Sequence, residues 1–291
     1  MYPPNFEYYA PTTLKEAVGL LEQHQGEAKV LAGGQSLIGM MKLRLAQPAA
    51  LIDINRIPGL AYLREDDKHL AIGALTRTAE LTRSEIVRAR YPVLSDAGAE
   101  IADPTVRRWG TVGGNVSHGD PGNDLPACML ALDAEYRAHG PKGARSIAAR
   151  KFYVDSFVTA LQPNEVLTEV RVPKPVPGTG NAYSKMERKV GDFATAAVAV
   201  HVLLAKNGRI ERAGIGLTNV GPTAIYATAA SEFLRAKSGT ADELAQAGQL
   251  AADASQPIAD NRGPVDFKKD MVRVWTRRTL TKAIARAKGG H

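Results

Sequence analysis

The chain has 291 residues, of which 23% are charged and 44% hydrophobic, with a net charge of +7. This composition is that of a folded globular protein and excludes disordered and fibrous classes, and no stretch approaches the ~18–20 apolar residues that a membrane span needs. The single cysteine, Cys128, excludes an internal disulfide, a cysteine-rich zinc site and a self-contained iron–sulfur cluster.

The first segment, to about residue 55, begins with a proline-rich lead that precedes a predicted helix. Thr13 and Glu16 have the spacing of a capping box, and apolar residues follow at helical spacing up to Leu21. A short strand over 29–31 is expected to run directly into Ala-Gly-Gly-Gln-Ser, residues 32–36. The remaining predicted elements of the segment are a helix over 37–45 and a buried strand over 51–54.

The second segment, 56–177, is predicted to contain several strands and a glycine-rich loop. The strands are expected at 62–65, 69–73, 134–138, 145–148 and 165–172. Residues 103–124 hold five glycines and two prolines and are expected to form a loop, with a short apolar helix over 125–132 after it. That helix contains Cys128, which favours a buried, inert thiol over a nucleophile.

The third segment follows a stretch rich in proline and glycine, 173–180, which is predicted to be a linker. Asn207 and Gly208 predict a type I′ hairpin between two strands. Strands are expected at 182–188, 194–205 and 210–217, and helices at 227–236, 242–254 and 271–287.

The basic charge is concentrated at the C-terminal end of the chain. Residues 264–291 hold eight Lys and Arg residues against two Asp residues. The helix expected over 271–287 has apolar residues on one side, which favours a docked helix with a solvated basic face. An acidic partner protein or a membrane surface is left open, whereas nucleic acid is not expected, since no known nucleic-acid-binding motif is present.

Two glycine-rich segments, 32–36 and 111–115, have features that suit the binding of a phosphate. Successive glycines let the backbone approach a ligand closely and turn several N–H groups toward it, and each segment also has a hydroxyl residue, Ser36 or Thr111. Singly, each could be no more than a tight turn. Together they suggest the two halves of a pyrophosphate-binding site.

The familiar motifs of other sites are missing. The sequence contains no Gly-x-Gly-x-x-Gly, no P-loop, no His-Glu-x-x-His and no Gly-x-Ser-x-Gly. The six histidines are scattered without ligand spacing, so no metal site is expected.

Several motifs in order resemble the FAD-binding medium subunits of the molybdenum hydroxylases, most strongly those of aerobic carbon monoxide dehydrogenases. The motifs are residues 32–36, 102–115, 119–127, 189–197, 216–220 and 262–264. The resemblance implies an α+β protein with a vanillyl-alcohol-oxidase-type (PCMH-type) FAD-binding fold in two subdomains and a C-terminal α+β domain. The boundaries expected for these three parts are 1–55, 56–177 and 178–291.

The family's FAD contacts are carried over residue by residue, and no residue is assigned a catalytic role. The resemblance implies that the two glycine loops hold the pyrophosphate and that Leu161, Lys185 and Phe193 lie near the flavin ring. The residues expected to bind FAD are Ala32, Gly33, Gly34, Gln35, Ser36, Thr111, Gly114, Asn115, Asp124, Leu161, Lys185 and Phe193.

Two of these positions depart from the family, which often has His at Gln35 and Tyr at Phe193. Both changes keep FAD binding but alter the groups that can tune the redox potential of the flavin and the choice of its oxidant. From the residues alone, other roles stay open: Asp124 as a helix N-cap, Lys185 as a solvated strand residue, and Phe193 as part of the core.

The resemblance implies an electron-transfer subunit of a dimer of heterotrimers. A molybdenum-containing large subunit would oxidise the substrate, a small subunit would carry 2Fe–2S clusters, and the FAD of this chain would pass electrons to quinone, with NAD or oxygen as other acceptors. The single cysteine independently supports a separate cluster-carrying subunit, because iron–sulfur clusters need several thiolates. Carbon monoxide, heterocycles and aldehydes remain open as substrates.

Two rival functions are kept, a self-sufficient FAD-dependent oxidase of the same fold and a non-enzymatic nucleotide- or nucleic-acid-binding protein. No signal peptide is visible at the N-terminus, so the expected location is cytoplasmic. The basic terminal helix leaves contact with the inner face of the membrane open.

Overall fold

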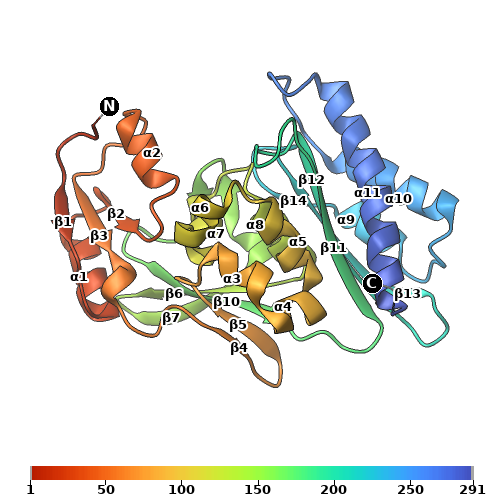
Figure 1. The fold of residues 1–291 in the computed structure, drawn as a ribbon, viewed down its shortest axis with the longest axis horizontal. Coiled ribbons are helices and arrows are strands. Elements are labelled where there is room, and N and C mark those ends of the chain that lie inside the picture. Colours follow the sequence, from red (N-terminus) through yellow and green to blue (C-terminus); the bar gives the residue numbers. More distant parts are fainter. Residues whose placement is uncertain (1, 290–291) are drawn as a thin grey trace.

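The computed structural model describes residues 2–289 as three units in a row, from the N-terminal end to the C-terminal helices (Figure 1). The first unit has a parallel sheet in the order β1-β3-β2. Its elements are β1 (Glu7–Tyr9), α1 (Leu14–Gln23), β2 (Ala28–Leu31), α2 (Leu37–Lys42), β3 (Ala50–Asp53) and the short η1 (Ile54–Arg56).

Helix α1 begins at Leu14 because Thr13, the residue before it, caps its N-terminus. The Thr13 side chain accepts a hydrogen bond from the Glu16 N–H at 3.2 Å, whereas the Glu16 carboxylate accepts one from the Thr12 N–H at 3.0 Å. The predicted capping box therefore forms only on the Thr13 side. Ala17, Val18 and Leu21 then point inward and bury the helix against the sheet.

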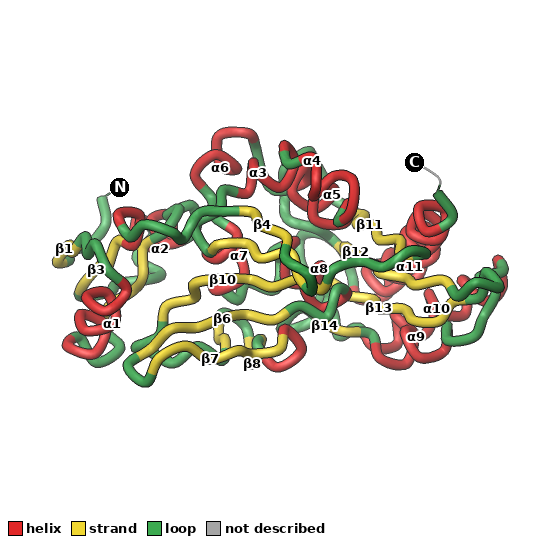
Figure 2. Tube along the Cα trace, turned by 90° about the horizontal axis from the view of Figure 1, so that it is seen from below, coloured by secondary structure: helices red, strands yellow, loops and turns green. Residues whose placement is uncertain are grey.

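The second unit has a five-stranded antiparallel sheet in the order β4-β5-β10-β6-β7, with helices α3 to α6 on one side of it (Figure 2). Its strands are β4 (Leu63–Glu65), β5 (His69–Gly73), β6 (Glu135–Gly140), β7 (Gly143–Ala148) and β10 (Val166–Pro173), with a separate ribbon of β8 (Tyr153–Asp155) and β9 (Val158–Thr159). Its helices are α3 (Thr78–Arg83), α4 (Glu85–Arg90), α5 (Pro92–Glu100), α6 (Pro104–Trp109), α7 (Val112–His118), α8 (Asp124–Ala131) and η2 (Ala149–Lys151).

The loop expected over 103–124 is instead built largely of the two short helices α6 and α7. Asp103 caps α6, because its carboxylate accepts hydrogen bonds from the N–H groups of Thr105 and Val106 at 2.7 and 2.9 Å. Thr111 caps α7 by accepting from the Gly114 N–H at 3.0 Å. These caps satisfy N–H groups at the start of both helices and offset part of the cost of about 1 kcal/mol for each glycine in α7, which a count of glycines and prolines does not reveal.

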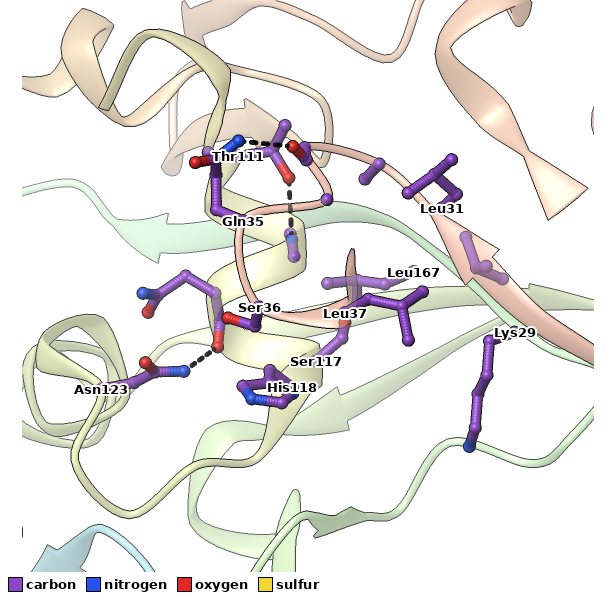
Figure 3. A pocket seen from close by; sticks show the side chains of 18 of the residues that line it. Lys29, Leu31, Gln35, Ser36, Leu37, Thr111, Ser117, His118, Asn123 and Leu167 are labelled. Carbon is purple, nitrogen blue, oxygen red and sulfur yellow. Dashed lines mark hydrogen bonds between the residues drawn. The ribbon is translucent and has the colours of Figure 1, made fainter. Parts of the chain in front are cut away.

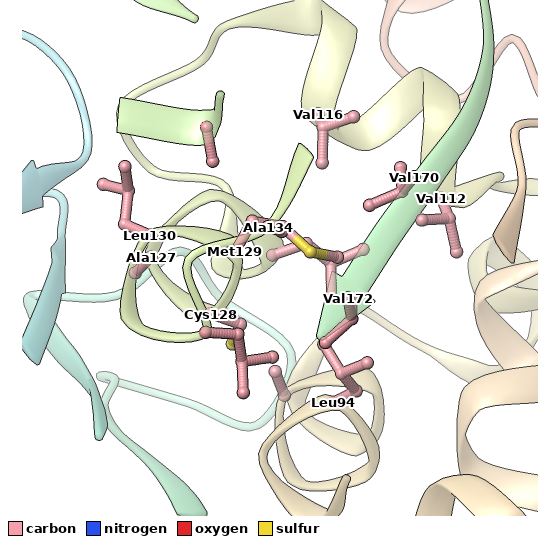
Figure 4. Packing of buried hydrophobic residues seen from close by; sticks show 14 of the residues in the cluster. Leu94, Val112, Val116, Ala127, Cys128, Met129, Leu130, Ala134, Val170 and Val172 are labelled. Atoms are coloured by element: carbon pink, nitrogen blue, oxygen red, sulfur yellow. The ribbon is translucent and has the colours of Figure 1, made fainter. Parts of the chain in front are cut away.

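Helix α8 is buried on all sides and forms the centre of the largest core (Figure 4). Cys128 is fully buried there, and burial raises the pKa of its thiol well above the usual value. The prediction of a buried thiol is therefore confirmed, and its inertness stays a prediction.

The third unit has an antiparallel sheet in the order β11-β12-β13-β14 that is covered on both faces. In β12, Ala197 and Ala199 face the core around α8, while Val198 and Val200 face α11. Burial on both faces explains why this strand reads as a continuous apolar run. Its elements are β11 (Thr179–Met186), β12 (Ala196–Leu204), β13 (Ile210–Thr218), β14 (Ile225–Tyr226), α9 (Thr228–Phe233), α10 (Ala241–Ala254) and α11 (Val265–Ala287).

Three details of this unit differ from the sequence predictions. Gly208 is left-handed (φ +77°) but Asn207 is not, and the Gly208 N–H donates to the Ala205 carbonyl at 2.9 Å, so the hairpin has a bulged turn rather than type I′. Strands β10 and β11 extend into the predicted linker and leave only 174–178 between them. Helix α11 starts at Val265, directly after Pro264, rather than at residue 271.

The basic face of α11 is partly neutralised by the rest of the chain. Lys282 and Arg286 contact Asp96 of α5 at 3.0 and 2.7 Å, and Lys268 is buried against Asp260 at 2.8 Å. The docked helix is confirmed, but these three cations act as internal ties. No helix among residues 2–289 is both long and apolar enough to cross a bilayer.

Candidate functional site

A cavity of about 790 Å³ lies where the first two units meet the start of the third (Figure 3). Its size is in the range of cofactor and ligand sites. All twelve residues predicted to bind FAD line it: Ala32, Gly33, Gly34, Gln35, Ser36, Thr111, Gly114, Asn115, Asp124, Leu161, Lys185 and Phe193.

The first glycine segment packs against residues 109–110, directly before the second segment, at the wall of this cavity. A Cβ atom on Gly33 would lie 2.4 Å from the carbonyl oxygen of Trp109, so only glycine allows this approach. Arg77 fixes the contact, because it donates to the Trp109 carbonyl at 2.7 Å and to the Asn55 side chain at 3.1 Å. Asn55 in turn donates to the Ala32 carbonyl at 2.8 Å.

The first segment presents unpaired backbone donors to the cavity. Within the described part of the chain, no group accepts a hydrogen bond from the backbone N–H groups of residues 33–36. Gly34 adopts a left-handed φ of +70°, and the Ser36 hydroxyl caps no helix. The Gln35 side chain folds back to donate to the Gly33 carbonyl at 3.1 Å. Such a run of backbone donors suits an anion.

The second segment does not present its backbone donors in this way. The N–H groups of Val112 and Gly113 donate to the carbonyls of Thr76 and Ala74, both at 2.9 Å, and that of Gly114 donates to the Thr111 hydroxyl. The expectation that successive N–H groups turn toward the ligand is therefore wrong for this segment. The Thr111 hydroxyl still has its own hydrogen to donate, because it only accepts in the cap.

Helix α7 adds polar atoms that lack a partner. The Asn115 Oδ1 and Ser117 Oγ atoms are buried, line the cavity and have no hydrogen-bond partner in the structure. Buried polar atoms are costly unless something binds them. Together with the close glycine wall and the unpaired N–H groups, these atoms fit a polar cofactor with a pyrophosphate.

Asp124 and Lys185 form a buried pair at the cavity. The Lys185 side chain is 1% exposed, and its Nζ atom lies 3.4 Å from Asp124, 3.3 Å from Glu187 and 2.9 Å from the Glu100 carbonyl. Burial raises the pKa of Asp124 to about 6, against the lowering effect of Lys185 and of a hydrogen bond from Tyr183. The N-cap of α8 is Asn123, so the N-cap role for Asp124 is wrong. Because the Lys185 side chain is buried, its role as a solvated strand residue is wrong as well.

Two apolar side chains, Phe193 and Leu161, line the cavity. Phe193 lies in the connection between β11 and β12 and is 48% exposed, which excludes the core role. Its ring contacts Gly122, where a Cβ atom would lie 2.8 Å from the ring. Leu161 is half-buried in the segment after β9.

Sequence reasoning missed several residues of the cavity, because Ser117 and His118 lie between two motifs and Asp192, although within the motif 189–197, was assigned no role. Ser117 lies three residues after Gly114 on α7, and helical spacing could have indicated it once 112–118 was read as a helix. His118 packs edge-on against Phe157 with ring centroids 5.2 Å apart, and burial lowers its pKa. Asp192, next to Phe193, also lines the cavity.

Two family models match the chain. The FAD binding domain in molybdopterin dehydrogenase matches residues 4–175, and the CO dehydrogenase flavoprotein C-terminal domain matches residues 181–283.

Individual relatives match over nearly the whole chain. The carbon monoxide dehydrogenase medium chain of Hydrogenophaga pseudoflava is 46% identical over 286 residues, which cover 98% of this chain and 99% of that protein. The 6-hydroxypseudooxynicotine dehydrogenase complex subunit alpha of Paenarthrobacter nicotinovorans is 38% identical, with 99% and 97% covered. The solved structure of carbon monoxide dehydrogenase from Hydrogenophaga pseudoflava aligns with a TM-score of 0.95 and 47% identity, with 98% and 99% covered.

These matches agree with the resemblance and with the cavity geometry. FAD is the cofactor, and the fold is a FAD-binding part followed by a C-terminal flavoprotein domain. The chain belongs to the family of FAD-binding medium subunits of molybdenum hydroxylases of the carbon monoxide dehydrogenase type.

Proposed function

We propose that this subunit carries electrons from the 2Fe–2S clusters of a partner subunit to an external acceptor. One observation supports the division of labour: the chain has a cavity suited to a dinucleotide but a single cysteine, which is buried. A cluster needs several thiolates, so the clusters that supply electrons to the FAD of this chain must lie in another chain. When bound, FAD supplies the redox chemistry, since it can exchange electrons singly or in pairs.

The residues of the cavity divide into two groups in this proposal. The N–H groups of residues 33–36 and the Thr111 hydroxyl would hold the pyrophosphate, and the orphaned oxygens of Asn115 and Ser117 would bind other polar atoms of the cofactor. Leu161 and Phe193 would pack against the flavin ring, and the Lys185–Asp124 pair would lie at its edge.

The proposed partners are a molybdenum-containing large subunit and a 2Fe–2S small subunit, assembled as a dimer of heterotrimers. The name "medium chain" of the relative from Hydrogenophaga pseudoflava supports a complex with larger and smaller subunits. Quinone is the proposed acceptor, and carbon monoxide is the proposed substrate of the complex. A cytoplasmic location, and contact of α11 with the membrane face, stay predictions.

Co-expression with the two partner subunits tests this function. The complex should show flavin absorbance, release FAD on heating, and lose that absorbance when carbon monoxide is added without oxygen. A complex whose iron–sulfur absorbance bleaches while the flavin stays oxidised would contradict the proposed electron path.

The acceptor is tested separately in the same complex. After reduction by carbon monoxide, a quinone analogue, NAD and oxygen are offered in turn, and the rate of flavin reoxidation is measured. Faster reoxidation by NAD or by oxygen than by quinone would overturn the proposed acceptor but not the electron path.

A further inference from the structure

We infer that Arg262 and Asp192 form a clasp that positions the ring of Phe193 at the cavity, so that the C-terminal domain shapes the flavin environment. This inference rests on the proposed packing of Phe193 against the flavin ring. Arg262 and Asp192 are 70 residues apart in the chain, and their ion pair joins two separate loops.

Asp192 is the centre of the clasp. One carboxylate oxygen accepts hydrogen bonds from the Phe193 N–H at 2.8 Å and from Arg262 at 3.0 Å, and the other accepts two from Arg188 at 3.0 and 3.1 Å. Burial raises the pKa of Asp192, but the hydrogen bonds from both arginines outweigh it and lower the pKa to about 2. The carboxylate is therefore charged at every working pH.

Arg262 binds the side chain of Asp192 and the backbone of the next residue, Phe193. Besides Asp192, its guanidinium contacts the Phe193 carbonyl at 3.4 Å. Its own loop is fixed in turn, because Asp260 accepts from the Arg262 N–H at 2.8 Å. Lys268 of α11 is 2% exposed and donates to Asp260 at 2.8 Å and to the Ile258 carbonyl at 2.9 Å. The loop that carries Arg262 is thus tied to helix α11 through Asp260 and Lys268.

Other contacts fix the far side of the same loop. Asn219 donates to the Ala194 carbonyl, and Gly191 lies so close to the Ala102 carbonyl that a Cβ atom would be 2.7 Å from it. Gly191 also needs its left-handed φ of +83°. The backbone around residue 193 is therefore held from three directions.

The side chain of Phe193 has no comparable support. It is 48% exposed, and the glycine beneath it, Gly122, contacts only part of the ring. The rotamers open to such a ring depend on the φ and ψ angles of the backbone that carries it. The clasp is therefore one of the contacts that set where this ring lies, and Arg262 is a positioning residue.

Arg188 provides a matched control. It contacts the same carboxylate, but it is 47% exposed and lies four residues before Asp192 on the same loop. Its ion pair is local and ties the loop to nothing else. Its removal should leave the position of Phe193 unchanged.

A double-mutant cycle in the full-length chain tests the clasp, with FAD as the probe and flavin fluorescence and visible circular dichroism as readouts. We expect Arg262→Ala and Phe193→Ala each to raise the FAD dissociation constant about tenfold. Because Arg262 acts through Phe193, the double variant should bind no more weakly than Phe193→Ala alone. Arg188→Ala should stay within about twofold of the wild type. Additive effects of the two substitutions would overturn the inference.

A second readout needs no flavin. Arg188 and Lys189 are exposed in the clasped loop, and trypsin cleaves after both. In the chain without FAD, Arg262→Ala should speed cleavage there about tenfold, while Arg262→Lys, which keeps the charge but lacks the planar fork of guanidinium N–H groups, should have a smaller effect. An unchanged cleavage rate would refute the clasp even if the wild type bound no FAD. Failure of the wild type to bind FAD would count against the proposed function alone.

Discussion

The two glycine loops that meet at the cavity contain the same Gly-Gly pair but use it differently. In residues 33–36 the backbone N–H groups have no acceptor among the described residues, so they can bind a ligand. At Gly113 and Gly114 the N–H groups are used by the start of α7, and the glycines instead let the helix pack closely, since a Cβ on Gly113 would lie 2.6 Å from that of Ala74. A Gly-Gly pair thus indicates close approach, and the neighbouring caps determine whether its N–H groups are available.

The largest effect is expected from Gly33→Ala, which separates the two loops. The added Cβ would meet the Trp109 carbonyl at 2.4 Å, so the free energy of unfolding should fall by about 1–3 kcal/mol, and FAD should be lost. Urea unfolding and the FAD content per chain measure both effects. Gly39→Ala in α2, where nothing lies within 4 Å, is the control and should keep stability and FAD. A Gly33→Ala protein with full FAD and normal stability would show that the loops do not depend on their contact.

Gly114→Val should abolish FAD binding while the chain stays folded. The new Cβ would lie 2.8 Å from the Thr111 Oγ1 atom and 4.0 Å from the Ala32 Cβ, so it displaces the cap and enters the cavity wall. Loss of the cap should cost about 1 kcal/mol. Absorbance of the purified protein, with a thermal melt beside it, measures the outcome. Full FAD occupancy in this variant would remove the second loop from the site.

The contrast between the loops is sharpened by comparing Thr111→Ala with Ser36→Ala. Thr111 caps α7, so its loss should lower the free energy of unfolding by about 1 kcal/mol, whereas Ser36 caps nothing and its loss should change stability by less than about 0.5 kcal/mol. Each should weaken FAD binding about threefold to tenfold. Thr111→Ser, which keeps the hydroxyl, is the control. Equal losses of stability in the two alanine variants would contradict the assigned roles.

Asp124, which lies outside both loops, should give the chain without FAD a distinct pH dependence. Burial raises the pKa of this carboxyl from the usual 3.8 to about 6, so the folded state favours the protonated form. Its contribution to stability is complete below about pH 4 and is lost as the pH rises through about 6. The free energy of unfolding of the wild type should therefore decline relative to that of Asp124→Asn over this interval. Parallel curves for the two proteins would contradict the raised pKa.

The smallest effect is expected from Lys185→Ala. If the Lys185 ammonium lies at the edge of the flavin, it stabilises the negative charge gained on reduction, so its removal should lower the midpoint potential. Asp124 and Glu187, within 3.4 Å, offset most of that charge, and we expect a shift of about 10 mV, or about 0.5 kcal/mol for a two-electron couple. A redox titration of the flavin measures it, and an unchanged potential would exclude this role.

Much of the fold could be predicted from patterns of neighbouring residues. The alternation and apolar runs of β5, β12 and β13 and the glycine segment at 32–36 follow from local spacing, and the structure has them near the expected positions. The helices α6 and α7 were missed because glycine and proline content was counted while the caps, Asp103 and Thr111, were not. The Asp192–Arg262 pair could not be found, since nothing in either local sequence refers to the other.

The sequence by itself determined the family, the cofactor and twelve of the residues that line the cavity, because these are carried by short motifs that resemble those of the family. Only the tertiary structure decided which N–H groups are free, that Lys185 is buried beside two carboxylates, and that the ring of Phe193 depends on an arginine 69 residues away. The physical reason is that hydrogen-bond satisfaction, burial and ion pairing depend on every group that packs nearby, and most of those groups are distant in the chain.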